Sequence, residues 1–251
     1  MLGILSLVGL PEFCAGDDLP AMLAAHIDAH GPALLAGDVL VVTQKIVSKA
    51  EGRQIDLASV VPSAEARALA LETGKNAALV ELVLRESSEV VRKAPNVLIT
   101  RHRLGHVMAN GGIDASNIGR GGEGRVLLLP EDPDASAARI ADALEARLGF
   151  RPGVVVSDSF GRPWRLGTVN VAIGVAAMPA VVDRRGEQDR DGRVMQMTLI
   201  ALADAVAAAA GLAMGEGAEG VPAAVVRGLD LSGAAQTART IVRPVGEDLF
   251  R

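Results

Sequence analysis

The sequence contains very few aromatic residues. Phe, Trp and Tyr together make up 2% of its 251 residues, and tyrosine is absent. Because single-stranded nucleic acid is usually bound on aromatic stacking platforms, this composition argues against that class of protein. The formal net charge is −5, whereas duplex recognition needs a basic surface. We therefore expect no nucleic-acid partner.

Cysteine is almost absent as well. Cys14 is the only one in the chain, so no internal disulfide can form and a zinc site built on several cysteines is excluded. Proteins of reducing compartments do not depend on disulfides. We therefore expect a cytoplasmic protein.

No long hydrophobic segment is present. The most apolar run, residues 199–214, contains Asp204 and is shorter than the roughly 20 residues that a membrane-spanning helix needs. The apolar N-terminus, residues 1–9, lacks basic residues and is followed by Pro11, which favours a first β-strand over a signal peptide. We expect no membrane association.

A glycine-rich Walker-type phosphate loop is also missing. Instead, residues 37–53 contain an apolar strand that is followed by Lys45 and Lys49, four residues apart. Two lysines with neighbouring hydroxyls after a buried strand suit phosphate binding. The alternative is a pair of solvated lysines beside a turn, and the spacing alone does not decide between the two.

The rest of the chain predicts a folded protein with a large core, since 49% of the residues are hydrophobic. Helices are expected at 19–30 (capped by Asp17 or Asp18), at 62–73, at 76–87, from a cap at Asp134 or Ser136 to 148, and at 197–210. Strands are expected at 1–9, in the apolar part of 37–53, and at 97–100, 126–129, 154–156, 169–173, 180–182 and 223–226. This irregular mixture favours an α+β fold, with mixed, largely antiparallel sheets flanked by helices. We expect a single unit spanning residues 1–251, with two intimately joined subdomains as an alternative.

The most informative stretch follows the β-branched run at 154–156. It contains Ser157, Asp158 and Ser159, then a Gly-Arg-Pro turn, and then Trp164 and Arg165. A carboxylate and a hydroxyl at the end of a buried strand can hold a hard cation. Arginines beyond it can grip phosphate or carboxylate, or only hold the turn. The stretch predicts a metal-assisted, anion-handling site.

Three further segments combine polar residues with glycine. Residues 101–119 predict a long loop in which Asp114 and Asn117 could serve a metal and a nucleotide, or form an Asx turn, which the spacing alone favours. Residues 214–222 form a glycine-rich loop in which Glu216 could reach a metal, unless the loop is a plain connector. Residues 183–193 predict a solvated hairpin or loop.

Five segments in the same order resemble the coenzyme F-420-0:L-glutamate ligase family. They are residues 9–13, 37–53, 110–117, 157–165 and 225–229, so the resemblance spans nearly the whole chain. These γ-glutamyl ligases build the polyglutamate tail of the deazaflavin coenzyme F-420. Some members carry a C-terminal nitroreductase-like domain, and we expect a stand-alone ligase here. The resemblance also implies an unusual mixed ligase fold and an intertwined homodimer.

The resemblance implies an activity and a set of site residues. The enzyme would use GTP to join L-glutamate to the lactyl carboxylate of F-420-0 through an acyl phosphate, and would add further γ-linked glutamate. Mg²⁺ or Mn²⁺ would occupy two sites, with K⁺ as a further candidate. The nucleotide would contact Leu10, Pro11, Glu12, Phe13, Gln44, Lys49, Asn117, Met214, Gly215, Glu216, Gly217, Ala218, Glu219, Gly220 and Val221, and the metals would bind Asp114, Asp158, Ser159 and Glu216.

No general base is predicted. His102 and His106 qualify by the ordinary pKa of histidine, but each is better explained as a surface residue or as a support for the site. Two other functions fit the same acids: a metal-dependent phosphatase or phosphotransferase, and a non-catalytic protein that binds a deazaflavin or a nucleotide.

Overall fold

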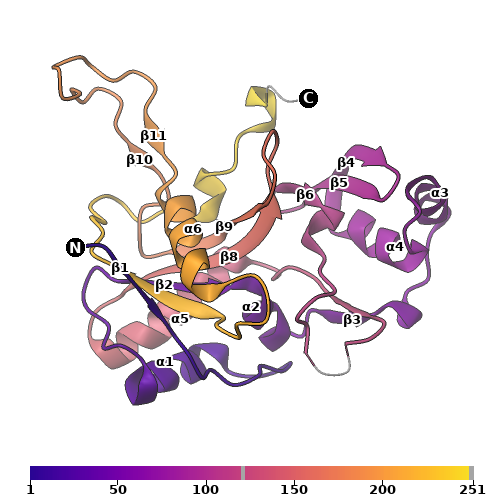
Figure 1. Ribbon diagram of the computed structural model, residues 1–251, viewed down its shortest axis with the longest axis horizontal. Helices are drawn as coiled ribbons and strands as arrows, with labels where there is room; N and C mark the ends of the chain where they lie inside the picture. The colour runs from indigo at the N-terminus through magenta and orange to yellow at the C-terminus, as the bar shows by residue number, and fades with distance from the viewer. Residues whose placement is uncertain (120–121, 249–251) are drawn as a thin grey trace.

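A five-stranded sheet runs through the centre of the computed structural model, which describes residues 1–119 and 122–248 (Figure 1). In spatial order its strands are β1 (Gly3–Ser6), β12 (Ala223–Arg227), β2 (Val39–Thr43), β8 (Gly153–Gly161) and β9 (Thr168–Ala176). Strands β2 and β8 are parallel, and the other three pairs are antiparallel. The mixed sheet confirms the predicted α+β architecture.

Helices cover both faces of this sheet, because successive residues of a strand point to opposite sides. Leu40 and Val42 pack with the helices α1 (Leu19–His30), α2 (Gln44–Ala50) and α5 (Pro133–Leu148). Val39 and Val41 pack with α6 (Leu202–Met214) on the other face. Burial on both faces explains why the central strands are continuous apolar runs.

A second lobe is inserted between α2 and α5. It contains the helices α3 (Ala64–Thr73) and α4 (Ala77–Arg85), and a sheet of β4 (Ser87–Ala94), β5 (Val97–His102) and β6 (Val107–Ala109). The ribbon β3 (Gln54–Asp56) with β7 (Arg125–Leu127) lies between this lobe and the central sheet (Figure 1). The lobe has its own hydrophobic core. The short 3₁₀-helices are η1 (Leu57–Ser59), η2 (Asn110–Gly112), η3 (Ala238–Thr240) and η4 (Val245–Glu247).

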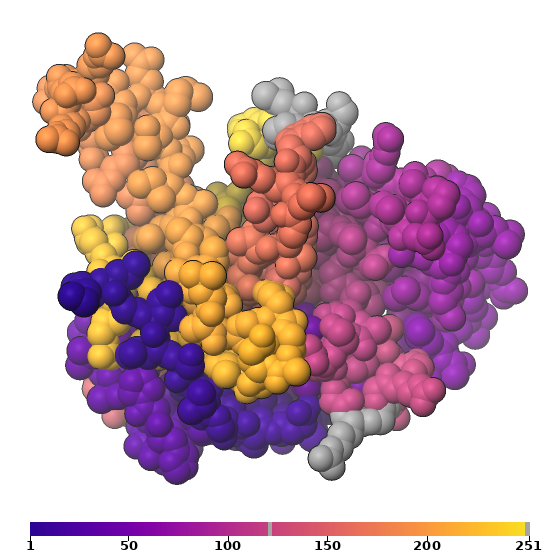
Figure 2. Space-filling model, in the orientation of Figure 1, coloured from indigo at the N-terminus to yellow at the C-terminus, as the bar shows by residue number. Residues whose placement is uncertain are grey.

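A long arm stands clear of the rest of the molecule (Figures 1 and 2). It starts at β10 (Val182–Asp183) and returns at β11 (Leu199–Ile200), which pair with each other. The predicted solvated hairpin at 183–193 is therefore confirmed. Within residues 1–119 and 122–248, no helix is long and apolar enough to cross a bilayer.

The helix predictions were accurate where a cap and an amphipathic pattern coincide. Helix α1 begins and ends as predicted, and Asp18 caps it. The cap of α5 was predicted wrongly: Asp132 accepts the capping hydrogen bond, while Asp134 is used elsewhere in the fold. Helix α6 starts at Leu202, since residues 199–200 form β11 instead of the first helical turn.

Two strand or loop predictions also need correction. The predicted long loop at 101–119 contains β6 and η2, because residues 107–109 pair with β5. Strand β8 does not end at Asp158 but continues to Gly161, paired with β9 throughout. Helix α2 and the strands β3 and β4 were not predicted.

Candidate functional site

A pocket opens where the parallel pairing of β2 with β8 ends. Thr43 and Ser157 are partners in the parallel register, so the residues that follow both strands meet at one edge of the sheet. The pocket has a volume of about 880 Å³, which suits a ligand of nucleotide size. Ligands of α/β sheets commonly bind beyond the carboxyl ends of parallel strands.

All of the predicted nucleotide residues line this pocket. They come from the loop after β1, from α2, from the loop after η2 and from the loop after α6: Leu10, Pro11, Glu12, Phe13, Gln44, Lys49, Asn117, and Met214 to Val221. Of the predicted metal ligands, Asp158, Ser159 and Glu216 line it too, and Asp114 precedes the lining residue Ala115. Segments that are far apart in the sequence therefore converge on one site.

Asp158 is the most perturbed acid of the pocket. Burial raises the pKa of its carboxyl group to about 7, and the nearby charge of Asp114 adds to the effect. Lys45 and the side chain of Gln44 act in the opposite direction. A cation between two neighbouring carboxylates would stabilise the ionised form of both.

Asp114 is held at the start of its loop by two partners. Its Oδ1 accepts hydrogen bonds from the backbone N–H (2.8 Å) and the hydroxyl (2.9 Å) of Ser116, which is an Asx turn. Its Oδ2 lies 2.6 Å from Lys45 Nζ. Burial alone would raise the pKa of Asp114, but these contacts outweigh it and lower the pKa. The turn and the acidic site thus occur together.

Glu216 is positioned from the hairpin of β8 and β9. Ser159 Oγ donates to its Oε2 at 2.7 Å, and Asn170 Nδ2 donates to its Oε1 at 2.5 Å. Ser159 and Asn170 are cross-strand partners. Asn170 was not predicted as a site residue, although the hairpin register around residues 161–168 places it opposite Ser159.

The lining of the pocket also contains hydrogen-bond donors. Lys49 Nζ lies 2.5 Å from Glu12 Oε1, and the Lys49 side chain is 11% exposed. Gln44 is buried, and its Oε1 accepts from Ser48 Oγ at 2.9 Å. Within the described chain, Gln44 Nε2 has no hydrogen-bond partner of ordinary geometry. A buried amide donor and a shielded ammonium fit the oxygens of an anionic ligand.

The two glycine-rich loops meet across the pocket. Asn117 Nδ2 donates to Gly217 O at 3.2 Å, and Glu219 accepts from the N–H of Gly217 at 2.7 Å. Gly215 has φ 74°, a positive backbone angle that favours glycine. Both loops contribute residues to the lining of the pocket.

Residues 8–228 match the family model described as F420-0:Gamma-glutamyl ligase. The chain belongs to this family. It is 41% identical over 252 residues to the coenzyme F420:L-glutamate ligase of Methanothermobacter thermautotrophicus, covering 100% of this chain and 99% of that one. It is 42% identical over 215 residues to the enzyme of that name from Methanocaldococcus jannaschii, covering 86% and 85%.

A third relative has a higher sequence identity to this chain than these two. The coenzyme F420:L-glutamate ligase of Natronomonas pharaonis is 46% identical over 229 residues, covering 89% of this chain and 85% of that one. The family resemblance that five short segments indicated is thus confirmed over the length of the chain.

The chemistry of the donor set in this F420-0:gamma-glutamyl ligase family member fits hard divalent cations. Carboxylate and hydroxyl oxygens are the ligands that Mg²⁺ and Mn²⁺ prefer. Among the described residues, no three His, Cys, Asp or Glu side chains gather as one metal cluster. The acids lie instead as two groups, Asp114 with Asp158 and Glu216 with Ser159. The buried charge at Asp158 is the observation that favours a cation there.

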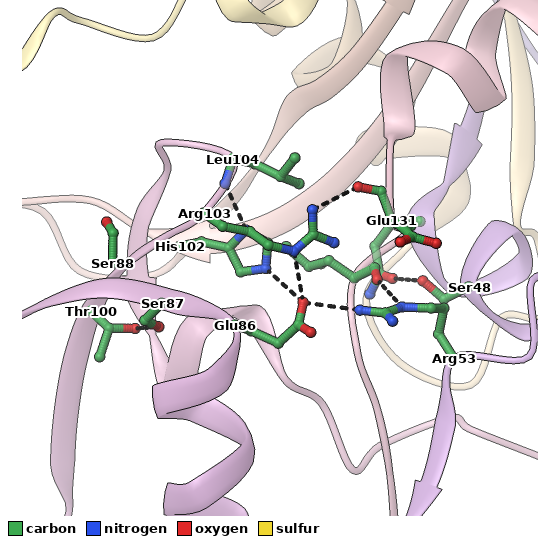
Figure 3. A network of polar contacts seen from close by, with 12 residues as sticks. Ser48, Arg53, Glu86, Ser87, Ser88, Thr100, His102, Arg103, Leu104 and Glu131 are labelled. Carbon is green, nitrogen blue, oxygen red and sulfur yellow. Dashed lines mark hydrogen bonds and ion pairs between the residues drawn. The ribbon is translucent and has the colours of Figure 1, made fainter.

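The histidines of this family member lie outside the pocket. His102 is 1% exposed, and its Nδ1 accepts from the N–H of Leu104 at 3.1 Å, so Nε2 carries the proton and lies 3.4 Å from Glu86 (Figure 3). Burial and the neighbouring His102 lower the pKa of His106 to about 4. Of the two explanations expected for His102, the surface position is wrong because the ring is buried, and neither histidine lines the pocket.

The tip of the β8–β9 hairpin is exposed. Trp164 is 86% exposed with φ 64°, and Leu166 is fully exposed. Arg162 and Arg165 are also exposed and make no hydrogen bond or ion pair within the part of the chain that the structure describes. The arginines therefore do not hold the turn.

Proposed function

We propose that this chain is a GTP-dependent ligase that joins L-glutamate to the lactyl carboxylate of F420-0 and adds further γ-linked glutamate. Family membership and the names of the relatives support the substrates. One observation supports the chemistry most directly: a single pocket is lined both by ammonium and amide donors and by acids, among which burial raises the pKa of Asp158. Such a pocket suits a nucleotide triphosphate and its metal ions.

GTP would lie between the loops that line the pocket. Lys49 and the amide of Gln44 would contact phosphate oxygens, since charged and buried donors bind them best. Leu10, Phe13 and the loop from Met214 to Val221 would enclose the nucleotide. Asn117 would contact it from the loop that already meets Gly217.

Asp114, Asp158, Ser159 and Glu216 would hold the Mg²⁺ or Mn²⁺ ions, and K⁺ stays a candidate further cofactor. When bound, divalent ions neutralise phosphate oxygens and the charge that develops during phosphoryl transfer. The chain's own contribution is positioning. Ser159 and Asn170 fix both oxygens of Glu216, and Ser116 fixes one oxygen of Asp114.

Amide formation needs an activated carboxylate, because hydroxide is a poor leaving group. The lactyl carboxylate would attack the γ-phosphorus of GTP, so that a P–O bond forms to the carboxylate and the bond to GDP breaks. The unprotonated amine of glutamate would then attack the carbonyl carbon of the acyl phosphate and release inorganic phosphate. We assign no general base, since no histidine lines the pocket.

The acceptor substrate would extend from the pocket toward the β8–β9 hairpin tip. Strand β8 runs directly from Asp158 to Gly161, and Arg162 and Arg165 follow at the exposed tip. Paired guanidinium donors recognise phosphate. The phosphodiester of F420-0 is the group that we place there.

A homodimer is part of the proposal. The arm from β10 to β11 exposes Met197 (87%), Leu199 (52%) and Ile200 (42%), and an isolated two-stranded ribbon is marginally stable in water. A second copy of the chain would cover this arm. We place the enzyme in the cytoplasm, where a lone exposed thiol such as Cys14 stays reduced.

The decisive test is an assay with purified protein, F420-0, L-glutamate, GTP and Mn²⁺. The expected products are GDP, phosphate and F420 with the added mass of glutamate. GDP release that does not depend on glutamate would indicate a phosphatase or phosphotransferase instead. Binding of GTP without turnover would indicate a non-catalytic binding protein.

The Asp158→Ala variant tests the site itself. We expect activity to fall by at least about a thousandfold, because a metal carboxylate is lost from the centre of the pocket. The circular dichroism spectrum should stay that of the parent protein. Full activity in a folded variant would remove Asp158 from the mechanism.

A further inference from the structure

Lys45 occupies an unusual position among the acids of the pocket. It belongs to the first turn of α2, and its side chain is 25% exposed. Its Nζ lies 2.6 Å from Asp114 Oδ2, 3.1 Å from Ser116 O and 3.2 Å from Ser116 Oγ. An ammonium group has three donors, and here three oxygens of one loop accept them. Lys45 is thus surrounded by oxygens of the kind that a hard cation binds.

The carboxylate of Asp114 has little room for a further partner. Its Oδ1 already accepts two hydrogen bonds from Ser116, and its Oδ2 faces the ammonium of Lys45. A divalent cation on Oδ2 would lie within a few ångströms of a positive charge. Since like charges at such a distance repel strongly in a partly buried site, the two cations cannot share this oxygen favourably.

Lys45 also acts on the second acid. Its charge favours the ionised form of Asp158, although Asp158 is not its hydrogen-bond partner. The ammonium therefore supplies counter-charge to both aspartates that the proposed function gives to the metal.

The other lysine of α2 does not share this position. Lys49 is paired with Glu12, and no contact joins it to Asp114 or Asp158 within the residues that the structure describes. The two lysines carry the same charge on the same helix, so they form a matched pair for an experiment.

We propose that Lys45 is a built-in counter-ion of Asp114 that a divalent cation must displace in order to bind. The proposal rests on the proposed function, because that function assigns Asp114 to the metal. The displaced ammonium stays on a flexible stem in the wall of the pocket, where it can pair with an anionic ligand. The divalent cation then enters the site in the same step in which Lys45 is released to bind phosphate.

The first experiment titrates Mn²⁺ into metal-free, nucleotide-free protein by isothermal titration calorimetry. Lys45→Met should bind Mn²⁺ about tenfold or more tightly than the parent protein, since no ammonium has to leave. Lys49→Met removes the same charge from a different position in the pocket. It should change the affinity for Mn²⁺ by no more than about twofold to threefold. Equal or weaker binding by Lys45→Met, or an equal gain in both variants, would overturn the proposal.

The Asp114→Asn variant separates this inference from the function on which it rests. Loss of Mn²⁺ binding in Asp114→Asn with no gain in Lys45→Met overturns only the role of Lys45. Unchanged Mn²⁺ binding in Asp114→Asn overturns the metal assignment of Asp114, and the inference with it.

A labelling experiment needs no variant and covers the case in which Lys45→Met does not fold. The parent protein is treated with an amine-acylating reagent, with and without Mn²⁺, and the labelled peptides are quantified by mass spectrometry. Lys45 should be protected without metal and several-fold more reactive with it, while Lys49 changes little. Labelling of Lys45 that does not rise with Mn²⁺ would contradict the displacement.

Discussion

Among the described residues outside the pocket, Glu86 has three donor neighbours, two of which are guanidinium groups. Arg53 lies 2.9 Å from its Oε2, Arg103 lies 3.2 Å away and His102 lies 3.4 Å away (Figure 3). Burial opposes ionisation, but hydrogen bonds from His102 and Arg53 and the charges of Arg53 and Arg103 lower the pKa of Glu86 to about 2. The charge of Glu86 therefore stabilises the folded chain.

This pKa predicts how stability depends on pH. Because the pKa of Glu86 is 4.5 ordinarily and about 2 in the fold, its contribution is complete above about pH 4.5 and is lost as the pH falls to about 2. The difference corresponds to roughly 3 kcal/mol at neutral pH. Glu86→Gln should therefore destabilise the protein strongly at pH 7 and much less near pH 3, measured by urea denaturation. An equal effect at both pH values would contradict the assignment.

Asn170 is a neutral residue that positions Glu216 in the pocket through a hydrogen bond. It is 8% exposed and donates to Glu216 Oε1. Removing a residue that orients a metal ligand commonly lowers activity or metal affinity by about tenfold to a hundredfold. We expect this loss in Asn170→Ala, measured as kcat/KM and as Mn²⁺ affinity, with unchanged thermal stability of the metal-free protein within a few degrees. Parent-like Mn²⁺ affinity would show that Asn170 does not position Glu216.

At the scale of elements, α5 is tied to the central sheet through its first turn. Asp134 Oδ1 accepts from the buried N–H groups of Val175 in β9 and Ala238 in η3, each at 2.8 Å. A side chain at Gly174 would collide with Pro133, so the strand and the helix approach very closely here. One carboxylate thus joins three elements.

This arrangement predicts that replacing Asp134 lowers the free energy of unfolding more than replacing Asp132. Asp134→Ala leaves two buried backbone donors without a partner and should cost about 2–4 kcal/mol of unfolding free energy. Asp132→Ala removes only the helix cap and should cost about 1 kcal/mol. Denaturant titration of both variants measures the difference. A larger loss for Asp132→Ala would mean that the cap, and not the junction, dominates.

At the scale of the whole molecule, the arm is the part that the fold leaves uncovered. Figure 2 shows it standing away from the body, and its side chains have no core of their own to pack against. Burial of exposed apolar residues is the main favourable term in most protein association. The shape of the single chain thus supports the proposed homodimer.

The proposed dimer predicts that a charge introduced on the arm weakens dimerisation, whereas a charge introduced elsewhere does not. Met197→Glu places a charge on the arm and should shift the protein from dimer to monomer in multi-angle light scattering at micromolar concentration. Leu212→Glu is the matched control, because Leu212 on α6 is also 87% exposed but lies outside the arm. A monomeric parent protein, or a dimer that both variants leave intact, would contradict the role of the arm.

The sequence by itself predicted most of the long elements and the residues that line the pocket. Apolar runs predicted the central strands, Asp18 was one of the two caps predicted for the first helix, and every residue given to the nucleotide lines one cavity. These features depend on neighbours along the chain and on short segments that resemble a family. They can therefore be predicted without knowledge of long-range contacts.

Only the tertiary structure decided which polar residues face one another. Lys45 meets Asp114, and Asn170 meets Glu216, across segments that are distant in the sequence. The same holds for Asp134, which the sequence offered as a helix cap but which the fold uses for β9 and η3. Buried polar groups must find partners wherever the packed elements bring them, and that choice is made by the assembled fold.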